Sequence, residues 1–537
     1  MTRHLLLIGD GKWIRWRQST PLLLLAACLT WQGVVAASDA PTKPSSTGKG
    51  KAILTVRDKK SGQTLPCRIH LHDAAGKPQR AGAFPFWNDH FVCDGNATVE
   101  LAPGRYSYEV ERGPEYSAAR GAFLVPAKDS VAVTVTLERL AELAAEGWWP
   151  GDLHVHRAVE DIELLMRAED LHIAPVITWH NGRSRWTGQG HLPTSLLRGF
   201  DRNRYYHLMA GEDEREGGAL LYFNLPRPLP LPGDRRSAGE YPSPLKYVAL
   251  ARQYANVWID VEKPFWWDVP VWLASGQIDS VGLANNHMCR SRMMDQEAWG
   301  KPRDTQRLPP PLGNGLWSQE IYYHILNSGL RLPPSAGSAS GFLPNPLGYN
   351  RVYVHVATPL RYDKWWDGLR AGRCFVTNGP LLRVTADGRL PGHVFTAPQD
   401  KEVRIEIKAQ LTSRDPIRVL EIIKNGHVEA KVPFAQWRKT GSLGTLTFRK
   451  SGWFLVRVIA DYPATFRFAS TGPYYVEIGA TKNPIRKASA QFFLNWVRER
   501  EKRIKLEDRK QLEEVLQHHQ AAEKFWQDRV AAADNSE

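Results

Sequence analysis

The sequence predicts an α/β domain, most simply a barrel, flanked by two β-sandwiches and followed by a helical segment. Strand and helix patterns alternate between residues 145 and 380, as in parallel α/β domains. Short alternating strands punctuated by Gly and Pro fill 50–140 and 381–480, which is typical of β-sandwiches. Residues 485–533 carry an apolar stripe in a charged helical pattern. We expect this amphipathic helix to dock on its own protein, with a dimerising coil as the alternative.

The first 37 residues resemble a secretory signal peptide. Basic residues precede the apolar run 21–27, and the small residues 35–37 fit a cleavage site before Ser38. The run is shorter than the roughly 20 residues that a membrane span needs. Residues 25–28 also resemble a lipoprotein box, so Cys28 is an alternative lipid anchor. We expect an exported protein, periplasmic or extracellular, with a linker at 38–49 before the folded part.

Composition places the chain among globular proteins. Its 537 residues allow several cores, and 42% of them are hydrophobic and 23% charged. The net charge of +14 is spread along the chain, which indicates a solvated basic surface, and no nucleic-acid-binding motif is present. In an oxidising compartment Cys67 and Cys93 could form a disulfide, whereas the apolar surroundings of Cys289 and Cys374 favour buried thiols.

The most informative residues are His154 and His156. In an extended strand side chains alternate between faces, so two histidines separated by one residue point the same way. Leu153 and Val155 would then face the opposite, buried side. Adjacent neutral imidazoles suit Zn, Mn or Fe. Two surface histidines on a polar strand face would be the alternative.

Further His, Asp and Glu residues fall where barrel strands end. Side chains at the carboxyl ends of parallel barrel strands converge on one mouth, where active sites lie. The sequence therefore predicts a metal site there, with one or two divalent ions. The candidate ligands are His154, His156, Asp161, His180, Glu212 and His287.

These residues also resemble a known family. The order Asp-Leu-His-x-His at 152–156, Asp161, Ile-Thr-x-His at 177–180, Gly-Glu at 211–212 and His287 is similar to the polymerase-and-histidinol-phosphatase (PHP) superfamily. Gly-Trp-Trp-Pro-Gly-Asp at 147–152 and Val-Thr-Asn-Gly-Pro at 376–380 resemble its CehA/McbA-like branch of exported metallohydrolases. The resemblance covers about 145–480. It implies a distorted (β/α)7 barrel holding metal ions that activate water, with Glu212 bridging two of them.

The sequence departs from this family at one place. Members usually supply a late Asp and His from Gly-Ser-Asp-x-His, but here residues 337–341 read Gly-Ser-Ala-Ser-Gly. Ala339 and Gly341 cannot bind a metal through their side chains, which should empty or weaken at least one ion site. The nearby Ser338, Ser340, His324 and Glu320 are candidate replacements.

Catalytic and substrate-binding roles follow from the same positions. Glu212 and the histidines would hold the ion, while Asp161 or Asp152 would orient or deprotonate water. Residues 213–216 are expected to form a solvated turn. The arginines that follow His180 and Glu212 could clamp an anionic group, or else form ion pairs with neighbouring carboxylates. The candidates for contact with substrate are Arg183, Arg185, Arg215 and Trp179.

Two functions remain open at this stage. The first is a metal-dependent hydrolase of an ester-type or phosphoester bond in a small or polymer-borne substrate. The second is a catalytically degenerate barrel that acts as an extracellular glycan or cell-surface binding scaffold. Twenty tryptophans, densest at 265–272, would either line an aromatic cleft for such a ligand or pack in the core. Six remaining ligand candidates favour the enzyme.

Overall fold

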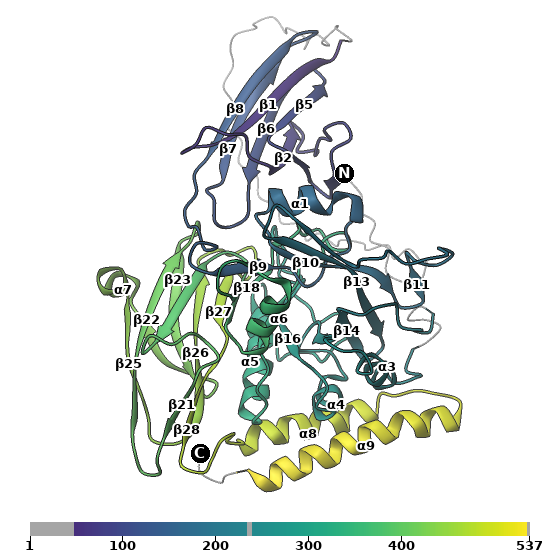
Figure 1. The fold of residues 1–537 in the computed structure, drawn as a ribbon, viewed down its shortest axis with the longest axis vertical. Coiled ribbons are helices and arrows are strands. Elements are labelled where there is room, and N and C mark those ends of the chain that lie inside the picture. Colours follow the sequence, from purple (N-terminus) through teal and green to yellow (C-terminus); the bar gives the residue numbers. More distant parts are fainter. Residues whose placement is uncertain (1–47, 234–238, 534–537) are drawn as a thin grey trace, which may run out of the picture. The chain divides into compact units, whose positions relative to one another are not determined.

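The computed structural model describes residues 48–233 and 239–533 (Figure 1). The predicted signal peptide 1–37 with Cys28, and the linker up to residue 47, lie outside the described residues. Among the residues that the structure describes, no helix has the length and apolar character that a membrane crossing requires. Helices alternate with several β-sheets, which confirms the predicted mixture of α/β and all-β structure at this level.

Residues 50–140 form two sheets around one hydrophobic core. The strands are β1 (Gly50–Asp58), β2 (Cys67–Asp73), β3 (Phe86–Trp87), β4 (His90–Cys93), β5 (Asn96–Leu101), β6 (Gly104–Glu111), β7 (Ala119–Val125) and β8 (Ser130–Leu137). They are ordered β5-β1-β8 and β3-β4-β2-β6-β7. Ala52, Leu54 and Val56, every second residue of β1, are buried in the shared core. This alternation is what the sequence pattern predicts for a half-buried strand.

The four cysteines of the described residues are buried free thiols, as predicted for Cys289 and Cys374. Cys67 in β2 lies directly opposite Cys93 in β4, and their Sγ atoms are 3.9 Å apart. A disulfide has an S–S distance near 2.05 Å, so the bond considered for this pair is not formed. The two thiols are nevertheless neighbours.

Residues 145–380 alternate strands with helices. The strands are β9 (Trp148–Gly151), β10 (Ile173–His180), β11 (Arg183–Ser184), β12 (Leu197–Phe200), β13 (Arg204–Arg215), β14 (Gly218–Phe223), β15 (Trp258–Val261), β16 (Ser280–Ala284), β17 (Pro334–Ala336), β18 (Arg351–His355) and β19 (Cys374–Thr377). The helices are η1 (Val159–Asp161), α1 (Ile162–Ala168), α3 (Pro244–Ala251), α4 (Val269–Ala274), α5 (Gly313–Asn327) and α6 (Tyr362–Arg370).

The sheet of this segment is not a simple ring of parallel strands. β10 pairs in parallel with β9 and β13, and β16 pairs in parallel with β15 and β17. In contrast β13–β14, β14–β15, β18–β9 and β18–β19 are antiparallel. The parallel pairs still bring the ends of β10 and β13 side by side, which positions the candidate site.

The tryptophans that the sequence singled out belong to the core. Trp179, Trp266, Trp272 and Trp365 are fully buried within the largest hydrophobic cluster. The alternative of an aromatic ligand cleft built from these rings is therefore wrong, because a stacked ligand needs an exposed ring face.

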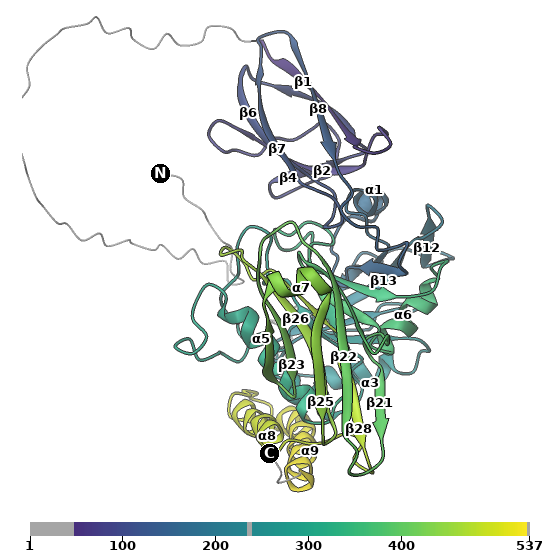
Figure 2. The ribbon, with the colours of Figure 1, turned by 90° about the vertical axis from the view of Figure 1, so that its left-hand side faces the viewer.

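Residues 381–480 form a second region made mainly of β-strands (Figure 2). Its elements are β20 (Leu381–Ala386), β21 (Val394–Ala397), β22 (Val403–Thr412), β23 (Ile417–Lys424), β24 (His427–Val432), α7 (Phe434–Thr440), β25 (Ser442–Phe448), β26 (Gly452–Ala460), β27 (Phe468–Thr471) and β28 (Tyr474–Ile478). β20, β22 and β25 make one sheet, and the remaining strands join the closed sheet of the preceding segment. Asn425 and Gly426, with φ of 53° and 90°, form the predicted tight turn between β23 and β24.

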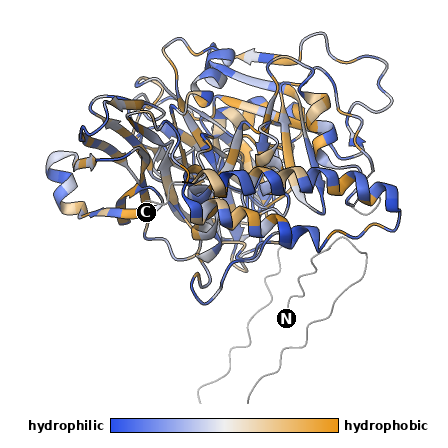
Figure 3. Cartoon of the chain, turned by 90° about the horizontal axis from the view of Figure 1, so that it is seen from below, coloured by the Kyte–Doolittle hydropathy of each residue, from blue (hydrophilic) through white to orange (hydrophobic). Residues whose placement is uncertain are grey.

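The C-terminal segment contains two helices rather than the single predicted helix. α8 (Lys487–Glu501) and α9 (Arg509–Ala532) mix hydrophobic and hydrophilic residues around their circumference (Figure 3). Trp526 of α9 is fully buried, stacks on Phe493 of α8 and donates a hydrogen bond to the Pro270 carbonyl at 2.9 Å. The apolar stripe thus docks on the protein itself, which is the arrangement the sequence favoured.

Candidate metal centre

His154 and His156 follow β9 in an extended segment between β10 and residues 336–340. Val155 forms parallel bridges with Val176 and Ser340, and the backbone N–H of His156 donates to the Ser340 carbonyl at 2.7 Å. Extended backbone places both imidazoles on one side, with their Nε2 atoms 3.0 Å apart. Val155 is fully buried on the other side, so the predicted orientation is confirmed.

Glu212 lies at the centre of the cluster. Its Oε2 atom is 3.4 Å from His154 Nε2, 3.1 Å from His156 Nε2 and 3.6 Å from His180 Nδ1. His180 ends β10, and the parallel pairing of β10 with β13 sets it directly beside Glu212. On the far side of the His180 ring, Nε2 lies 3.2 Å from Glu214 Oε2.

These residues form two overlapping groups that could hold a metal ion. One is His154, His156 and Glu212, and the other is His180, Glu212 and Glu214; within each group the ligand atoms lie within 4.8 Å of one another. Two ligands bound at about 2.1 Å in tetrahedral geometry are roughly 3.4 Å apart. The nitrogen–oxygen distances around Glu212 match that spacing, and mixed imidazole and carboxylate donors suit Zn, Mn or Fe.

Glu262, which directly follows β15, contacts the Nδ1 side of the His154 ring. Its Oε1 atom is 3.3 Å from His154 Nδ1, and it also accepts a hydrogen bond from Asn286 Nδ2 at 2.7 Å. Its Oε2 atom accepts from Trp266 Nε1 at 2.9 Å and pairs with Lys263. A carboxylate that accepts a hydrogen bond from Nδ1–H fixes the tautomer of the imidazole and leaves Nε2 available as a metal ligand. Glu262 is a positioning residue that the sequence interpretation missed.

The ionisable groups of this cluster shift the pKa values of one another. Burial alone would raise the pKa of Glu212, but attraction to His180 and His154 outweighs it and holds that pKa well below its usual range. Burial lowers the pKa of His154, yet Glu212 and Glu262 together raise it to about 10. Glu212 and Glu214 raise the pKa of His180 to about 9 in the same way. A divalent ion must displace these protons, so its binding releases protons and strengthens with pH.

The cluster reaches solvent on one side only. The side chains of His154 and Glu212 are each 4% exposed, whereas those of His180 and Glu214 are 25% and 20% exposed. Phe342 is 60% exposed. The centre of its ring lies 5.6 Å from the centre of the His156 ring and 6.1 Å from the centre of the His180 ring. A substrate would therefore approach along His180, Glu214 and Phe342.

Three predicted acid–base or ligand residues lie outside the two groups. Asp152 is fully buried and accepts backbone N–H groups of His154, Ser338 and Gly348 at 2.7–3.0 Å, so it holds the loops rather than contacting water. Asp161 stands at the N-cap of α1. His287 donates Nδ1–H to the Gln296 carbonyl at 2.8 Å, and burial lowers its pKa to about 3.

The predicted substrate-binding residues have other partners or positions. Arg215 is fully buried and paired with Asp213, and Trp179 is a core residue. The expected solvated turn at 213–216 is thus wrong, because β13 continues through it to Arg215. Arg185 pairs with Glu160 at the surface, where an ion pair contributes about 0–1 kcal/mol. Arg183 is exposed in β11.

The loop 337–341 runs directly beside the histidine pair. Gly341 has a φ of 96°, and a Cβ there would lie 2.5 Å from the His156 carbonyl oxygen. Ala339 is fully buried with a φ of 50°. Among the proposed replacements, Ser338 exchanges hydrogen bonds with the Asn350 backbone and His324 stacks on Phe492.

Ser340 is different from the other replacement candidates. Its hydroxyl is buried and has no hydrogen-bond partner among the described residues, and the residue bridges Val155 between the two histidines. Glu320 is engaged by Arg307 at 2.6 Å on the surface. Of the four candidates, Ser340 alone has both a neighbouring position and an uncommitted oxygen.

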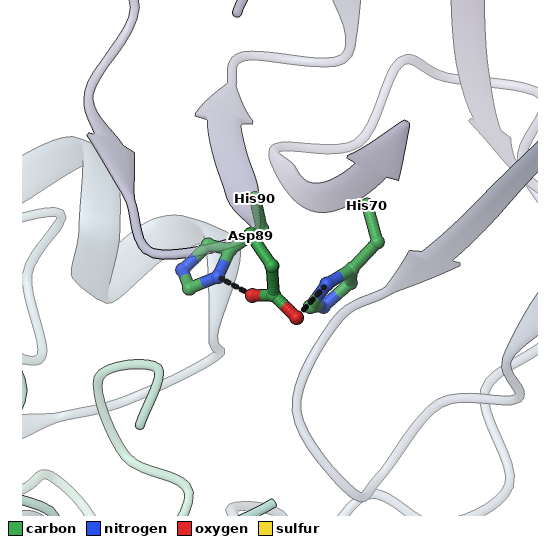
Figure 4. A group of neighbouring side chains, drawn as sticks. All are labelled: His70, Asp89 and His90. Atoms are coloured by element: carbon green, nitrogen blue, oxygen red, sulfur yellow. Dashed lines mark hydrogen bonds and ion pairs between the residues drawn. The ribbon is translucent and has the colours of Figure 1, made fainter. Parts of the chain in front are cut away.

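A third group, His70, Asp89 and His90, lies in the segment 50–140 (Figure 4). The Asp89 carboxylate lies between the rings, 3.2 Å from His70 Nδ1 and 3.0 Å from His90 Nδ1. Arg68 Nε donates to His70 Nε2 at 3.1 Å, which leaves the proton of the neutral ring on Nδ1, facing Asp89. This arrangement favours a proton-linked His–Asp–His cluster over a metal site.

Comparisons with known proteins add little to this geometry. No protein-family model matches the chain, and no curated protein matches it. Among solved structures, the minor pilin GBS52 of Streptococcus agalactiae is 17% identical over 18% of this chain and 46% of that chain, with a TM-score of 0.16. A similarity at this level carries no argument about fold or function, so the inference rests on the site itself.

Proposed function

We propose that this protein is a metal-dependent hydrolase of ester-type or phosphoester bonds that uses metal-activated water. The observation that carries the proposal is the position of Glu212, whose Oε2 atom lies 3.1–3.6 Å from nitrogens of three histidines. His154, His156 and Glu212 would hold one divalent ion. His180 and Glu214, sharing Glu212, would hold a second or complete the coordination of the first.

The chemistry of the residues supports this role. A divalent ion held there would lower the pKa of bound water toward about 7 and polarise the scissile carbonyl or phosphoryl group. Glu262 orients His154. With a single ion on His154, His156 and Glu212, Glu214 is the partly exposed carboxylate left free to accept a proton from attacking water. Phe342 supplies an apolar wall beside the exposed edge of the site, which fits a substrate with an apolar portion next to the scissile bond.

The family resemblance belongs to the same proposal. A distorted (β/α)7 barrel of the PHP superfamily, CehA/McbA-like branch, with two flanking β-sandwiches agrees with the alternating strands and helices of 145–380. Export to the periplasm or cell exterior, with or without a lipid on Cys28, would bring the site to small or polymer-borne substrates. Loss of donors at Ala339 and Gly341 reduces the ligand set to the two groups around Glu212.

The alternative is a degenerate barrel that binds extracellular glycans or cell-surface material without catalysis. The positions of Asp161 and His287 outside both ligand groups favour it, because family ligands beyond the Glu212 cluster are then not assembled. The burial of Trp266, Trp272 and Trp365 speaks against a glycan site made from these rings.

Metal content tests the proposal. Purified full-length protein, reconstituted with Zn, Mn or Fe and desalted, should retain one or two equivalents by plasma mass spectrometry. Glu212→Gln should lose them, whereas His427→Ala, which removes an exposed histidine, should not. Absence of stoichiometric metal in the wild type, or full retention in Glu212→Gln, would overturn the proposal.

Turnover then separates the two functions. Aryl esters and aryl phosphates should be hydrolysed by the metal-loaded protein and not by Glu212→Gln. A metal-loaded protein that turns over no member of either series would instead support the binding scaffold.

A further inference from the structure

A small pocket lies among residues of the segments 50–140, 145–380 and 381–480, and it shares no residue with the candidate metal centre. Its volume is about 50 Å³. That is more than the roughly 30 Å³ share of one water molecule in the liquid, and enough for one small polar group. The lining is dominated by guanidinium groups. The charged residues in it are Arg68, Arg290, Arg351, Arg414, Arg467, Glu111, Glu169 and Asp415.

One carboxylate serves three of these arginines. Glu111 Oε2 lies 2.6 Å from Arg68 Nη2 and 2.7 Å from Arg290 Nη2, and Glu111 Oε1 lies 2.8 Å from Arg414 Nη1. Burial would raise the pKa of Glu111, but the arginines hold it well below its usual range, so this carboxylate is fully charged. A single negative charge cannot neutralise three guanidiniums.

The other carboxylates do not remove the imbalance. Asp415 is bound by Arg467 Nη1 at 2.8 Å, and Glu169 pairs with Arg68. Burial raises the pKa of Glu169, which disfavours its charge. Glu109, which is not in the lining, binds Arg290 at 2.6 Å. Five guanidiniums therefore face at most four carboxylates, and buried charge without a counter-charge is costly.

Three donors in the lining lack an acceptor. Arg414 Nη2 and Arg467 Nε are buried without a hydrogen-bond partner among the described residues. The Tyr349 hydroxyl lies beside Arg467, and no acceptor for its proton is found in the described ranges. Buried donors are rarely left unpaired in folded proteins, because each has lost its hydrogen bonds to water without gaining another. A negatively charged hydrogen-bond acceptor would both balance the positive charge of this pocket and pair with its free donors.

We propose that this pocket binds a small oxyanion group, such as phosphate, sulfate or the carboxylate of a ligand. Planar guanidinium groups match such oxygens in geometry, and desolvated charge-assisted hydrogen bonds are the strong ones. The anion accepts from Arg414, Arg467 and Tyr349 and supplies the missing negative charge. Because its ligands come from three segments of the chain, the bound anion stabilises their association. This inference is independent of the proposed hydrolase.

Binding is measured on the full-length protein by thermal unfolding and calorimetry. Phosphate, sulfate and acetate are each compared with sodium chloride at equal ionic strength. The variants are Arg414→Gln and Tyr349→Phe, the second removing only one oxygen, with the exposed Arg449→Gln as the matched control. Each titration is repeated in Glu212→Gln, so that an anion bound through a metal ion at the candidate metal centre is not counted.

At least one anion should raise the melting temperature saturably above that in chloride, with the folding equilibrium constant increasing tenfold at nine times Kd. Arg414→Gln and Tyr349→Phe should raise Kd by tenfold or more, and Arg449→Gln should leave it unchanged. A response to phosphate and sulfate alone identifies a tetrahedral oxyanion, and a response to acetate identifies a carboxylate. No shift beyond that in chloride, or equal binding by the two pocket variants and the wild type, would overturn the proposal.

Discussion

Replacing Gly341 by alanine tests whether the loop 337–341 packs tightly against the histidine pair. Gly341 has a φ of 96°, and its added Cβ would lie 2.5 Å from the His156 carbonyl oxygen and 2.6 Å from the His156 carbonyl carbon. It would also lie 3.0 Å from the Arg157 amide nitrogen. All three neighbours are backbone atoms, so no side-chain rotation can relieve the contact, and the loop or the histidine segment must move.

Two costs add in this variant. An L-residue in the left-handed region loses about 1–2 kcal/mol, and overpacking against rigid neighbours adds about 1–3 kcal/mol. We expect the free energy of unfolding to fall by about 2–5 kcal/mol. Gly276→Ala is the matched control, because Gly276 has a φ of 68° but its added Cβ would meet nothing within 4 Å. That variant should lose only the conformational cost of about 1–2 kcal/mol.

The assay is equilibrium urea unfolding followed by tryptophan fluorescence. Equal losses of stability in the two variants would refute the close approach of the loop to His156. If the difference is found, no larger side chain could be placed at position 341 without displacing the backbone of His156.

Three other outcomes follow from the described contacts. Burial lowers the pKa of His519 to about 4 from 6.5, so the unfolded chain binds more protons below pH 6.5. The free energy of unfolding should therefore fall by about 2–3 kcal/mol between pH 7 and 4.5. In urea unfolding, His519→Gln should show a shallower dependence of this free energy on pH, and an unchanged dependence would contradict the reasoning. A mild oxidant should join Cys67 and Cys93, whose Sγ atoms are 3.9 Å apart, with a loss of two mass units that Cys93→Ser abolishes; persistence of both thiols would count against the strand register. Trp526→Ala should destabilise the docked α8–α9 pair by about 3–5 kcal/mol and speed amide hydrogen exchange there, whereas the exposed Lys524→Ala should not.

The part of the site that sequence predicted depended on local backbone rules. Alternation along an extended segment is enough to place His154 and His156 on one side. His180 ends β10, and Glu212 lies three residues before the end of the parallel strand β13, so the rule that such ends converge predicted that the two residues are neighbours. These three histidines and Glu212 are the residues that the structure assembles.

The rest depended on tertiary context. Glu262 was missed because β15 is only four residues long and includes the buried Asp260, so its pattern does not stand out as a strand. Glu214 was assigned to a solvated turn because residues 213–216 are all charged, yet Asp213 and Arg215 neutralise each other inside the core. His287 follows β16, but the structure places it in neither group of potential ligands, and its Nδ1–H donates to the Gln296 carbonyl.

For the fold, composition and periodicity identified the strand-rich and alternating segments but not how their sheets join. A tight turn such as Asn425-Gly426 has a local signature. Pairing between β19 and β27, which are about ninety residues apart in sequence, has none. The second helix of the C-terminal segment was missed because one apolar stripe continues through both helices.

The pairing of β19 with β27 also determines where this chain could be cut into separately expressed parts. Thr377 of β19 pairs with Ala469, so the strand that closes 145–380 is completed only by a strand from 381–480. A chain cut near residue 380 would expose the β19 edge, with its unsatisfied backbone groups open to pairing with other chains. The two regions consequently share one continuous hydrogen-bonded sheet. A gene fusion or expression boundary drawn between them would separate hydrogen-bonded neighbours, whereas the start of β1 is a boundary that leaves this sheet intact.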